Sequence, residues 1–458
     1  MLGLDNLFKY HKIPLLFIVL STICYLSFAY DLVRTDISKL LLLYIALFVF
    51  AYQIIKKTGF YFRLLVISAV LFRLLFLFAI PNLSQDFYRF IWDGRMMLEG
   101  FNPYLYTPDN IIQNGGTKIA QAKELYNGMG ALSASHFTNY PPINQLCFIL
   151  ANLFPGKSIL SSVIGLRLII IAADIGTLYF GKKLLERLKL PSNRIFWYVL
   201  NPFIIIELTG NLHFEGVMIF FLIWSLYLLH SGKWKLAAVV LACSISVKLI
   251  PLMFLPLFFW WFMSNKKIET SVFAGMKKLI SFYGIIGIVT ILLFLPFFSL
   301  EFIDNYSKTV GLWFGNFEFN ASIYYLLREI GYAITGYNEI AIIGKVLPIV
   351  SLLTILGFSF LKQNNATSKL ITSILLVFTI YLFLSTTVHP WYISTLVILC
   401  VFTNYRFPLV WSFIIILSYL AYSNTENTEN LWIIGFEYLI VFIAFIWEVL
   451  LKKRLPLI

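Results

Sequence analysis

Residues 61–100 run YFRLLVISAVLFRLLFLFAIPNLSQDFYRFIWDGRMMLEG, and this stretch decides the fold. Its first half, 61–80, is a nearly unbroken apolar run of about the length that a membrane-spanning helix needs. Its second part, 84–100, carries charged and apolar side chains at helical spacing. We therefore predict a membrane helix that leads into an amphipathic helix lying on the membrane surface.

The whole chain shares the apolar character of this stretch. Of its 458 residues, 60% are hydrophobic and 12% are charged, with a mean hydropathy of +0.84, whereas a soluble domain is about half apolar and about a quarter charged. This composition excludes a cytosolic enzyme and a disordered chain. The four cysteines lie inside apolar runs as small core residues, so a disulfide scaffold is excluded as well. An all-α polytopic membrane protein is predicted.

Apolar runs long enough for membrane helices recur along the entire chain. A short run, 141–155, is expected to enter the membrane from the outer side without crossing it. In total we expect a bundle of about 13–15 membrane segments, at 13–30, 38–55, 61–80, 160–180, 195–210, 216–230, 236–249, 250–263, 279–298, 340–361, 370–388, 390–403, 407–422 and 431–451.

The distribution of lysine and arginine orients these segments. With the amino terminus inside, alternate short loops carry most of the 35 basic residues, among them Lys56, Lys57, Arg63 and a group at 182–194. Cytoplasmic loops carry such an excess in membrane proteins, so the net charge of +13 records topology and no nucleic-acid partner is expected. Both termini are predicted to be cytoplasmic, in a cell inner or plasma membrane.

Two long loops, 81–158 and 299–339, then lie on the outer side. Long loops in compact proteins are usually functional or disordered, and the prolines and aromatic residues of the first loop argue for order. Three regions are predicted. They are the N-terminal membrane helices (1–80), an outer loop with juxtamembrane helices that carries the chemistry (81–158), and a membrane bundle that includes the second outer loop (159–458).

The helix predicted at 84–100 carries the first group of candidate site residues. At 100° per residue, Asp86, Arg89 and Asp93 form one stripe, and an apolar stripe lies about a third of a turn away. Two carboxylates and an arginine would thus face the same side at the membrane surface. The alternative is a solvated face whose charges pair at spacings of three and four residues.

Further polar residues fall where predicted spans end on the outer side. His213 and Glu215 stand between two spans, where they form a polar turn or, with a third ligand, a metal site. Lys248 lies near the outer end of its span, where a lysine either snorkels to the interface or serves a site. His389 and Tyr392 open another span, at a depth where aromatic side chains are also typical of the interfacial belt.

Taken in order, these segments resemble the polyprenol-phosphate-mannose-dependent mannosyltransferases, integral membrane glycosyltransferases of the GT-C fold. The resemblance spans residues 84–392, about two thirds of the chain; its motifs are short, so it is their order that is specific. The family's acidic pair is often adjacent, whereas Asp86 is flanked by Gln85 and Phe87, and more helices precede the loop than is usual. The matching motifs are DFYR (86–89), WDGR (92–95), GFNPY (100–104), YPP (140–142), NP (201–202), GNLH (210–213), KLIP (248–251) and HPWY (389–392).

The resemblance implies that a sugar moves from a polyprenyl-phosphate donor to a glycan or glycolipid acceptor at the outer leaflet. Mannose is favoured over glucose, galactose or arabinose. Asp86 matches the family's catalytic aspartate, and Asp93 is the second carboxylate that could act as base. Arg95 or Lys248 would bind the donor phosphate. The other residues implied to contact the substrates are Tyr88, Arg89, Asp93, Tyr140, His213, Glu215, His389 and Tyr392.

The implied reaction requires few functional groups. One carboxylate and a cation suffice for an inverting displacement, because a phosphate leaving group needs no strong acid, unlike the alcohol released by a glycosidase. No nucleotide site is expected, since the sequence has no glycine-rich phosphate loop, and a divalent metal is compatible with the sequence without being indicated. The alternatives are a transporter or flippase, which would carry charges along a central path, and another membrane transferase such as a glycan polymerase or an acyltransferase.

Overall fold

The computed structural model describes residues 12–58, 61–115, 118–264, 271–315, 317–423 and 428–451. Across these ranges the chain is helical, and its only β contact is an isolated bridge between Phe319 and Thr387. The predicted all-α polytopic membrane fold is confirmed. The predicted cytoplasmic ends, 1–11 and 452–458, lie outside the described residues.

Seven helices in the described chain are long and apolar enough to cross a bilayer, and each coincides with a predicted segment. Side-chain N-caps begin three of them, because Ser158, Ser271 and Asn430 accept backbone N–H groups. The seven are α2 (Lys12–Asp31), α3 (Ile37–Thr58), α9 (Ile159–Arg187), α15 (Val272–Phe294) with η4 (Leu295–Phe297), α18 (Ile340–Phe360), α19 (Thr367–Leu384), and α22 (Leu431–Phe445) with η7 (Ile446–Leu450).

The remaining predicted segments are shorter or interrupted: the described chain has seven full-length spans, or eight if one bent pair is a single span, and four shorter apolar helices. Proline is the recurrent cause of the breaks, at Pro202, Pro251 and Pro390 among others, because its ring is tolerated only near the start of a helical piece. The shorter pieces are α4 (Phe62–Leu74), η1 (Ser192–Ile195), α10 (Phe196–Val199), α11 (Pro202–Ile204), η2 (Ile205–Gly210), α12 (Glu215–His230), α13 (Trp234–Val247), η3 (Ile250–Phe258), α14 (Phe259–Met263), η5 (Pro390–Tyr392), α20 (Ile393–Val401), α21 (Phe407–Ile414) and η6 (Ile415–Ser423).

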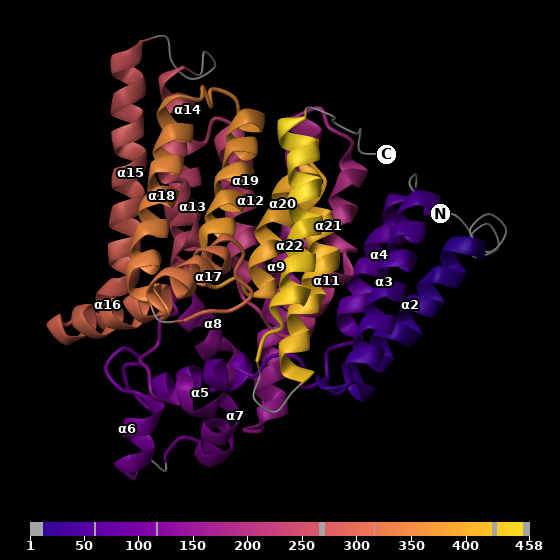
Figure 1. Cartoon of the computed structure of the whole chain (residues 1–458), viewed down its shortest axis with the longest axis vertical. Coiled ribbons are helices and arrows are strands. Elements are labelled where there is room, and N and C mark those ends of the chain that lie inside the picture. Colours follow the sequence, from indigo (N-terminus) through magenta and orange to yellow (C-terminus); the bar gives the residue numbers. More distant parts are fainter. Residues whose placement is uncertain are drawn as a thin grey trace.

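The long helices run side by side, and the helices of the two long loops gather toward one end of the bundle (Figure 1). We call this end the loop end; α2 begins and η7 ends at the opposite end. The loop end carries α5 (Asp86–Leu98), α6 (Pro108–Gln113), α7 (Ala122–Ala134) and α8 (Pro142–Asn152), with α16 (Leu300–Gly315) and α17 (Ile323–Thr335) lying toward it.

Helix α8 is the structured part of the predicted segment 141–155. It has 11 residues, which is about 16 Å at 1.5 Å per residue. The hydrocarbon core of a bilayer is about 30 Å thick. A helix of this length covers about half of a crossing, as expected for a segment that enters the membrane without spanning it.

Two buried arginines join the N-terminal helices to the bundle. Arg73 of α4 donates to Asp174 of α9 at 2.7 Å, and both side chains are 2% exposed. Arg167 of α9 donates to the carbonyl oxygens of residues 77, 79, 209 and 210. A charge among apolar helices is stable only when hydrogen bonds satisfy it. These contacts fix the entry to the first long loop and the end of η2.

The outer surfaces of α15 and α18 are apolar. Ile288, Ile291, Ile342, Ile349 and Leu353 are each more than half exposed. Such a continuous exposed apolar face marks a surface that needs a partner other than water. With the seven spans, it identifies an integral membrane protein whose surrounding partner is the lipid bilayer.

Candidate active site

The first turn of α5 brings Asp86 to the boundary between the loop helices and the bundle. Its backbone N–H donates to the Ser84 hydroxyl at 3.3 Å. The helix was predicted over 84–100 and spans Asp86–Leu98, ending before Gly100, whose φ of +86° suits the residue that follows a helix. The Asp86 side chain is half-buried. It therefore remains reachable from the space outside the helix.

The carboxylate of Asp86 has no hydrogen-bond or ion-pair partner among the described residues. Burial raises its pKa to about 6, an effect that Lys248 opposes and Glu215 reinforces. A carboxylate whose pKa lies near the working pH is suited to accept a proton and release it again. Asp86 is thus an unpaired carboxylate with raised proton affinity.

A salt bridge between Lys248 and Glu215 lies beside Asp86. The Lys248 Nζ atom is 2.8 Å from Glu215 Oε1; the Glu215 side chain is fully buried, and 18% of the Lys248 side chain is exposed. Lys248 follows the end of α13 in an extended backbone conformation, and Glu215 begins α12, where a helix N-terminus stabilises a carboxylate. The ammonium group also lies 5.3 Å from the ring centroid of Tyr140. The exposed part of this ammonium group can still meet an anion.

A broken span supplies His213 and Glu215. The segment of α11 and the π-helical η2 meets α12 at an angle of 115°, and Glu207 holds the bend. Its carboxylate accepts hydrogen bonds from the Tyr419 hydroxyl at 2.9 Å and from the Asn211 amide at 3.4 Å. π-Helical turns are frequent at functional sites. Glu207 shapes the turn on which two predicted site residues stand.

Two histidine rings stack on the indole of Trp391. The ring centroid of His213 lies 3.6 Å from that of Trp391, and the centroid of His389 lies 4.5 Å from it, with interplanar angles of 18° and 8°. Burial, aided by the charge of Lys248, lowers the pKa of His389 to about 3, so this ring is neutral at neutral pH. The Nδ1 atom of His389 is buried and has no hydrogen-bond partner among the described residues.

The second long loop holds the segment that carries His389. Val388 donates its N–H to the Phe319 carbonyl at 2.8 Å, and Phe319 donates to the Thr386 carbonyl at 3.1 Å. The Phe319 ring lies 5.1 Å from that of His389. Asn320 then donates its backbone N–H to Glu429 at 2.7 Å, which ties the loop to the start of α22. Contacts between segments far apart in the sequence therefore fix the position of the His389 ring.

Arg89 and Asp93, the other members of the predicted stripe, face a different environment. Arg89 Nε lies 2.7 Å from Asp93 Oδ1, and both residues are buried. Gln145 of α8 donates to the second Asp93 oxygen at 3.2 Å, and Arg89 also donates to the carbonyl oxygens of Ser133 and His136. These contacts fasten α5 to α8 and to the end of α7. The pair therefore serves the architecture of the loop.

Arg95 and Tyr88 also lie against the loop helices rather than beside Lys248. The guanidinium of Arg95 donates to carbonyl oxygens at 120 and 157 and to the side chains of Gln121, Asn152 and Ser162. All of its donor nitrogens are thus engaged within the first long loop and the start of α9. The Tyr88 ring packs directly against Gly128 of α7, where a Cβ atom would meet it at 2.7 Å.

The structure thus gathers most of the predicted site residues into one cluster, hereafter the Asp86 cluster. Tyr140 and Tyr392 belong to it as electrostatic neighbours of both Asp86 and Glu215. Arg89 and Asp93 border it as electrostatic neighbours of Tyr140, and Tyr88 and Arg95 lie outside it. The described residues hold no group of three or more histidine, cysteine, aspartate or glutamate side chains that could bind a metal ion. The cluster consists of Asp86, Tyr140, His213, Glu215, Lys248, His389 and Tyr392.

Three neighbours of the cluster were not assigned from the sequence. Glu207 carried a signal, because a carboxylate inside an apolar run is costly and often functional. Trp391 resembled an ordinary belt residue. Arg34, between α2 and α3, lies 4.2 Å over the ring of Tyr422, which is an electrostatic neighbour of Asp86. A single arginine in a short turn has no spacing that would have revealed it.

Comparison with known proteins assigns the chain to a family. No curated protein matches the chain. Residues 25–264 match the family model described as the alpha-(1->6)-mannopyranosyltransferase, N-terminal domain, of the MptA_B family. The match covers more than half of the chain and includes Asp86, Tyr140, His213, Glu215 and Lys248. The chain therefore belongs to this family of α-(1→6)-mannopyranosyltransferases and is a membrane-embedded glycosyltransferase that transfers mannose.

Proposed function

We propose that the enzyme transfers mannose from a polyprenyl-phosphate donor to a glycan or glycolipid acceptor at the outer face of the membrane, with Asp86 as general base. The observation that carries this proposal is an unpaired, half-buried carboxylate with a raised pKa beside a lysine at one end of a membrane bundle. A lipid-linked donor suits a site that lies beside membrane helices.

The reaction is an in-line displacement at the anomeric carbon of the donor. The acceptor hydroxyl oxygen forms a bond to this carbon, the bond from the carbon to the phosphate oxygen breaks, and the hydroxyl proton moves to Asp86. The products are the mannosylated acceptor and polyprenyl phosphate. Because a single displacement inverts the anomeric centre, an α-linked product requires a β-linked mannosyl phosphate as donor.

Lys248 is the cation that we assign to the donor phosphate. It belongs to the Asp86 cluster, and part of its side chain is exposed, whereas the donors of Arg95 are engaged elsewhere. The leaving phosphate carries its own charge, so a positioned ammonium group can stabilise it without proton transfer. Glu215 would hold the ammonium group in place until the donor arrives.

The loop end is proposed to face the outer side. In support, basic residues gather at helix ends opposite to it, with Lys56 and Lys57 in the last turn of α3 and Arg187 in the last turn of α9. The Asp86 cluster would then lie at the depth of the outer headgroups. A lipid-linked donor and a glycolipid acceptor meet at that depth without leaving the membrane.

The test is a transfer assay with the purified full-length enzyme in detergent or nanodiscs. We expect mannose to move from radiolabelled β-mannosyl-phosphoryl polyprenol to extracted cell glycolipids, and Asp86→Asn to slow this transfer by about 10²–10⁴-fold while still binding the donor. GDP-mannose serves as the comparison donor. Transfer from GDP-mannose alone would refute the lipid donor, and lipid-sugar movement across vesicle membranes without transfer would favour a flippase.

A further inference from the structure

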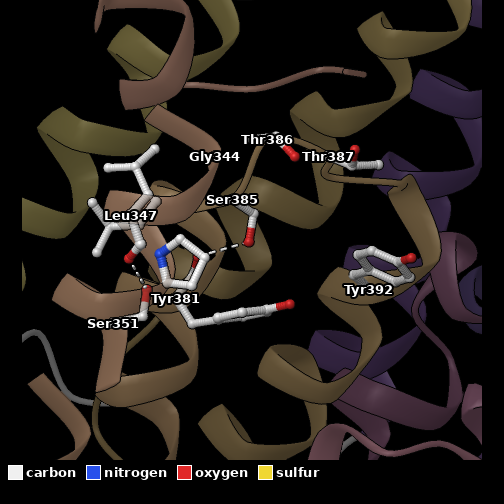
Figure 2. A pocket seen from close by; sticks show the side chains of 10 residues that line it. Gly344, Leu347, Ser351, Tyr381, Ser385, Thr386, Thr387 and Tyr392 are labelled. Carbon is white, nitrogen blue, oxygen red and sulfur yellow. Dashed lines mark hydrogen bonds between the residues drawn. The ribbon is translucent and has the colours of Figure 1, made fainter. Parts of the chain in front are cut away.

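A groove lies between α18 and α19, and Figure 2 shows the side chains that line it. Gly344, Leu347, Pro348 and Ser351 of α18 form one wall, and the end of α19 with residues 384–387 forms the other. The volume of the groove is about 90 Å³. The wall of α18 is mainly apolar, and the hydroxyl groups belong mostly to the residues that follow α19.

Tyr392 borders both this groove and the Asp86 cluster. Its ring lines the groove, and it is an electrostatic neighbour of Asp86 and Glu215. On its other side it meets the ring of His389 edge-on, with centroids 5.5 Å apart. The groove therefore meets the Asp86 cluster at Tyr392, next to His389.

The depth of the groove corresponds to one leaflet of the membrane. Helix α18 follows α17 at the loop end and spans residues Ile340–Phe360, so Gly344 to Ser351 lie between its second turn and its middle. These residues cover about 10 Å along the helix axis. A ligand in the groove would begin at headgroup depth, beside Tyr392, and continue into the hydrocarbon of the same leaflet.

The groove is also reachable from the bilayer. Pro348, which lines the groove, is exposed on the surface of α18, and Val346 and Ile349 on the same helix are each at least half exposed. A chain-like molecule could enter sideways past this helix without crossing water. A water-soluble ligand would gain nothing from such a route.

We propose that this groove holds the first isoprene unit of the donor, next to its phosphate, an assignment that rests on the proposed function. A cavity of about 150 Å³ lined by apolar side chains binds benzene; a groove of about 90 Å³ therefore suits an apolar unit on the order of five carbons. The first unit would lie against Gly344 and Leu347, and the phosphate would extend past Tyr392 toward Lys248. The rest of the chain would lie in the bilayer along α18.

A bulky substitution in the groove tests this assignment. Gly344→Leu fills the groove, and Gly357→Leu is the matched control, because a Cβ atom at Gly357 on the same helix meets no atom within 4 Å. We expect Gly344→Leu to raise the KM for β-mannosyl-phosphoryl polyprenol at least about tenfold, since steric misfit of one methylene in an apolar pocket changes specificity by about 10–200-fold. The control is expected to keep the wild-type KM.

A second measurement uses the wild-type enzyme and so does not depend on the folding of a variant. A prenyl phosphate with a diazirine on its first isoprene unit is irradiated with the protein, and the labelled peptides are mapped. We expect label within 344–351 or 381–387, and less label when unmodified polyprenyl phosphate competes. Label confined to the lipid-exposed face of α15, or at α2 and η6, would overturn the assignment.

The outcomes separate the groove from the proposed function. If the wild-type enzyme does not use the lipid donor, both proposals fail. If it uses the donor while Gly344→Leu keeps the wild-type KM and the label falls elsewhere, only the groove assignment fails. If the prenyl chain of a glycolipid acceptor, and not the donor, competes for labelling, the groove belongs to the acceptor and our assignment is wrong.

Discussion

The first and later turns of α5 carry the same kinds of side chain in different surroundings. Asp86, in the first turn, is half-buried and has no partner among the described residues. Asp93, two turns later, is fully buried and is held by Arg89 at 2.7 Å and by Gln145 at 3.2 Å. One helix thus presents a free carboxylate to the bundle and a satisfied one to its own loop.

The same contrast holds for the two cations that the sequence offered for the donor phosphate. Arg95 uses its donor nitrogens on the loop and on the start of α9. Lys248 keeps a single ion-pair partner, Glu215, and an exposed edge. A charge whose hydrogen-bonding capacity is already used stabilises the fold, whereas one with capacity left over can act on a substrate.

The largest expected effect comes from removing the free carboxylate. We expect Asp86→Asn to lower kcat by about 10²–10⁴-fold, the usual contribution of a general base, with donor binding retained because the amide keeps the shape of the side chain. Single-turnover transfer and a donor-binding assay measure the two quantities. Normal turnover by Asp86→Asn together with a folded but inactive Asp93→Asn would reverse the roles of the two carboxylates.

The next effect concerns the cation. We expect Lys248→Met to raise the donor KM by roughly 10–100-fold, because a hydrogen bond to a charged group contributes about 1.5–3 kcal/mol. This change also leaves Glu215 buried and unpaired, so the double variant Lys248→Met/Glu215→Gln is the control for folding. A double variant that is stable and has a wild-type donor KM would exclude Lys248 as the phosphate ligand.

The pH dependence of the reaction follows from the raised pKa of Asp86. Its carboxyl group has a pKa of about 6; below this pH the group is protonated and cannot accept the acceptor's proton. We expect kcat/KM to fall about tenfold per pH unit below pH 6 and to level off above it. A steady-state profile from pH 4.5 to 8 measures this limb. If the residual activity of Asp86→Asn showed the same fall in kcat/KM below pH 6, the group that titrates would not be Asp86.

The smallest kinetic effect is expected where the charge is already satisfied. Asp93→Asn should leave kcat within about threefold of wild type, because general-base chemistry does not involve this group. Removing one member of a buried ion pair costs about 3–5 kcal/mol, so the melting temperature in detergent should drop clearly. Arg89→Met is a parallel test. A stable Asp93→Asn enzyme with severely reduced kcat would place this carboxylate in the reaction.

Much of this molecule follows from its sequence, because helical periodicity and apolar length are local properties. The helix that begins at Asp86, the seven long spans and the grouping of His213, Lys248 and His389 on one side were all predicted from spacing and span ends. The interrupted spans were not, since a hydropathy window does not detect a helix that restarts at proline. Hydropathy alone therefore did not separate the seven full-length spans from the shorter and bent segments.

The division of roles within α5 could not be predicted from the helix alone. Asp86 and Asp93 share one stripe, and what separates them is contact with Gln145 and with backbone carbonyl groups of α7. Every residue has a backbone carbonyl oxygen, so the sequence does not indicate which ones accept a hydrogen bond. For the same reason the contacts of Arg95 with the carbonyl oxygens of residues 120 and 157 could not be predicted. The free carboxylate is recognised only when every neighbour in space is known.

The contacts of Arg167 bear on how the chain enters the membrane during synthesis. The carbonyl oxygens of residues 77 and 79 emerge before Arg167, and that of Thr209 follows it by 42 residues. If α9 inserts after α4, the carbonyl oxygens of residues 77 and 79 are already present to accept hydrogen bonds from the Arg167 guanidinium. The bent span follows α9 in the chain. Lipid cannot hydrogen-bond the free backbone carbonyl groups at its bend, but the guanidinium of Arg167 is already in place to donate to them. We therefore expect Arg167 to hold the entry to the first long loop before the bent span is added beside it.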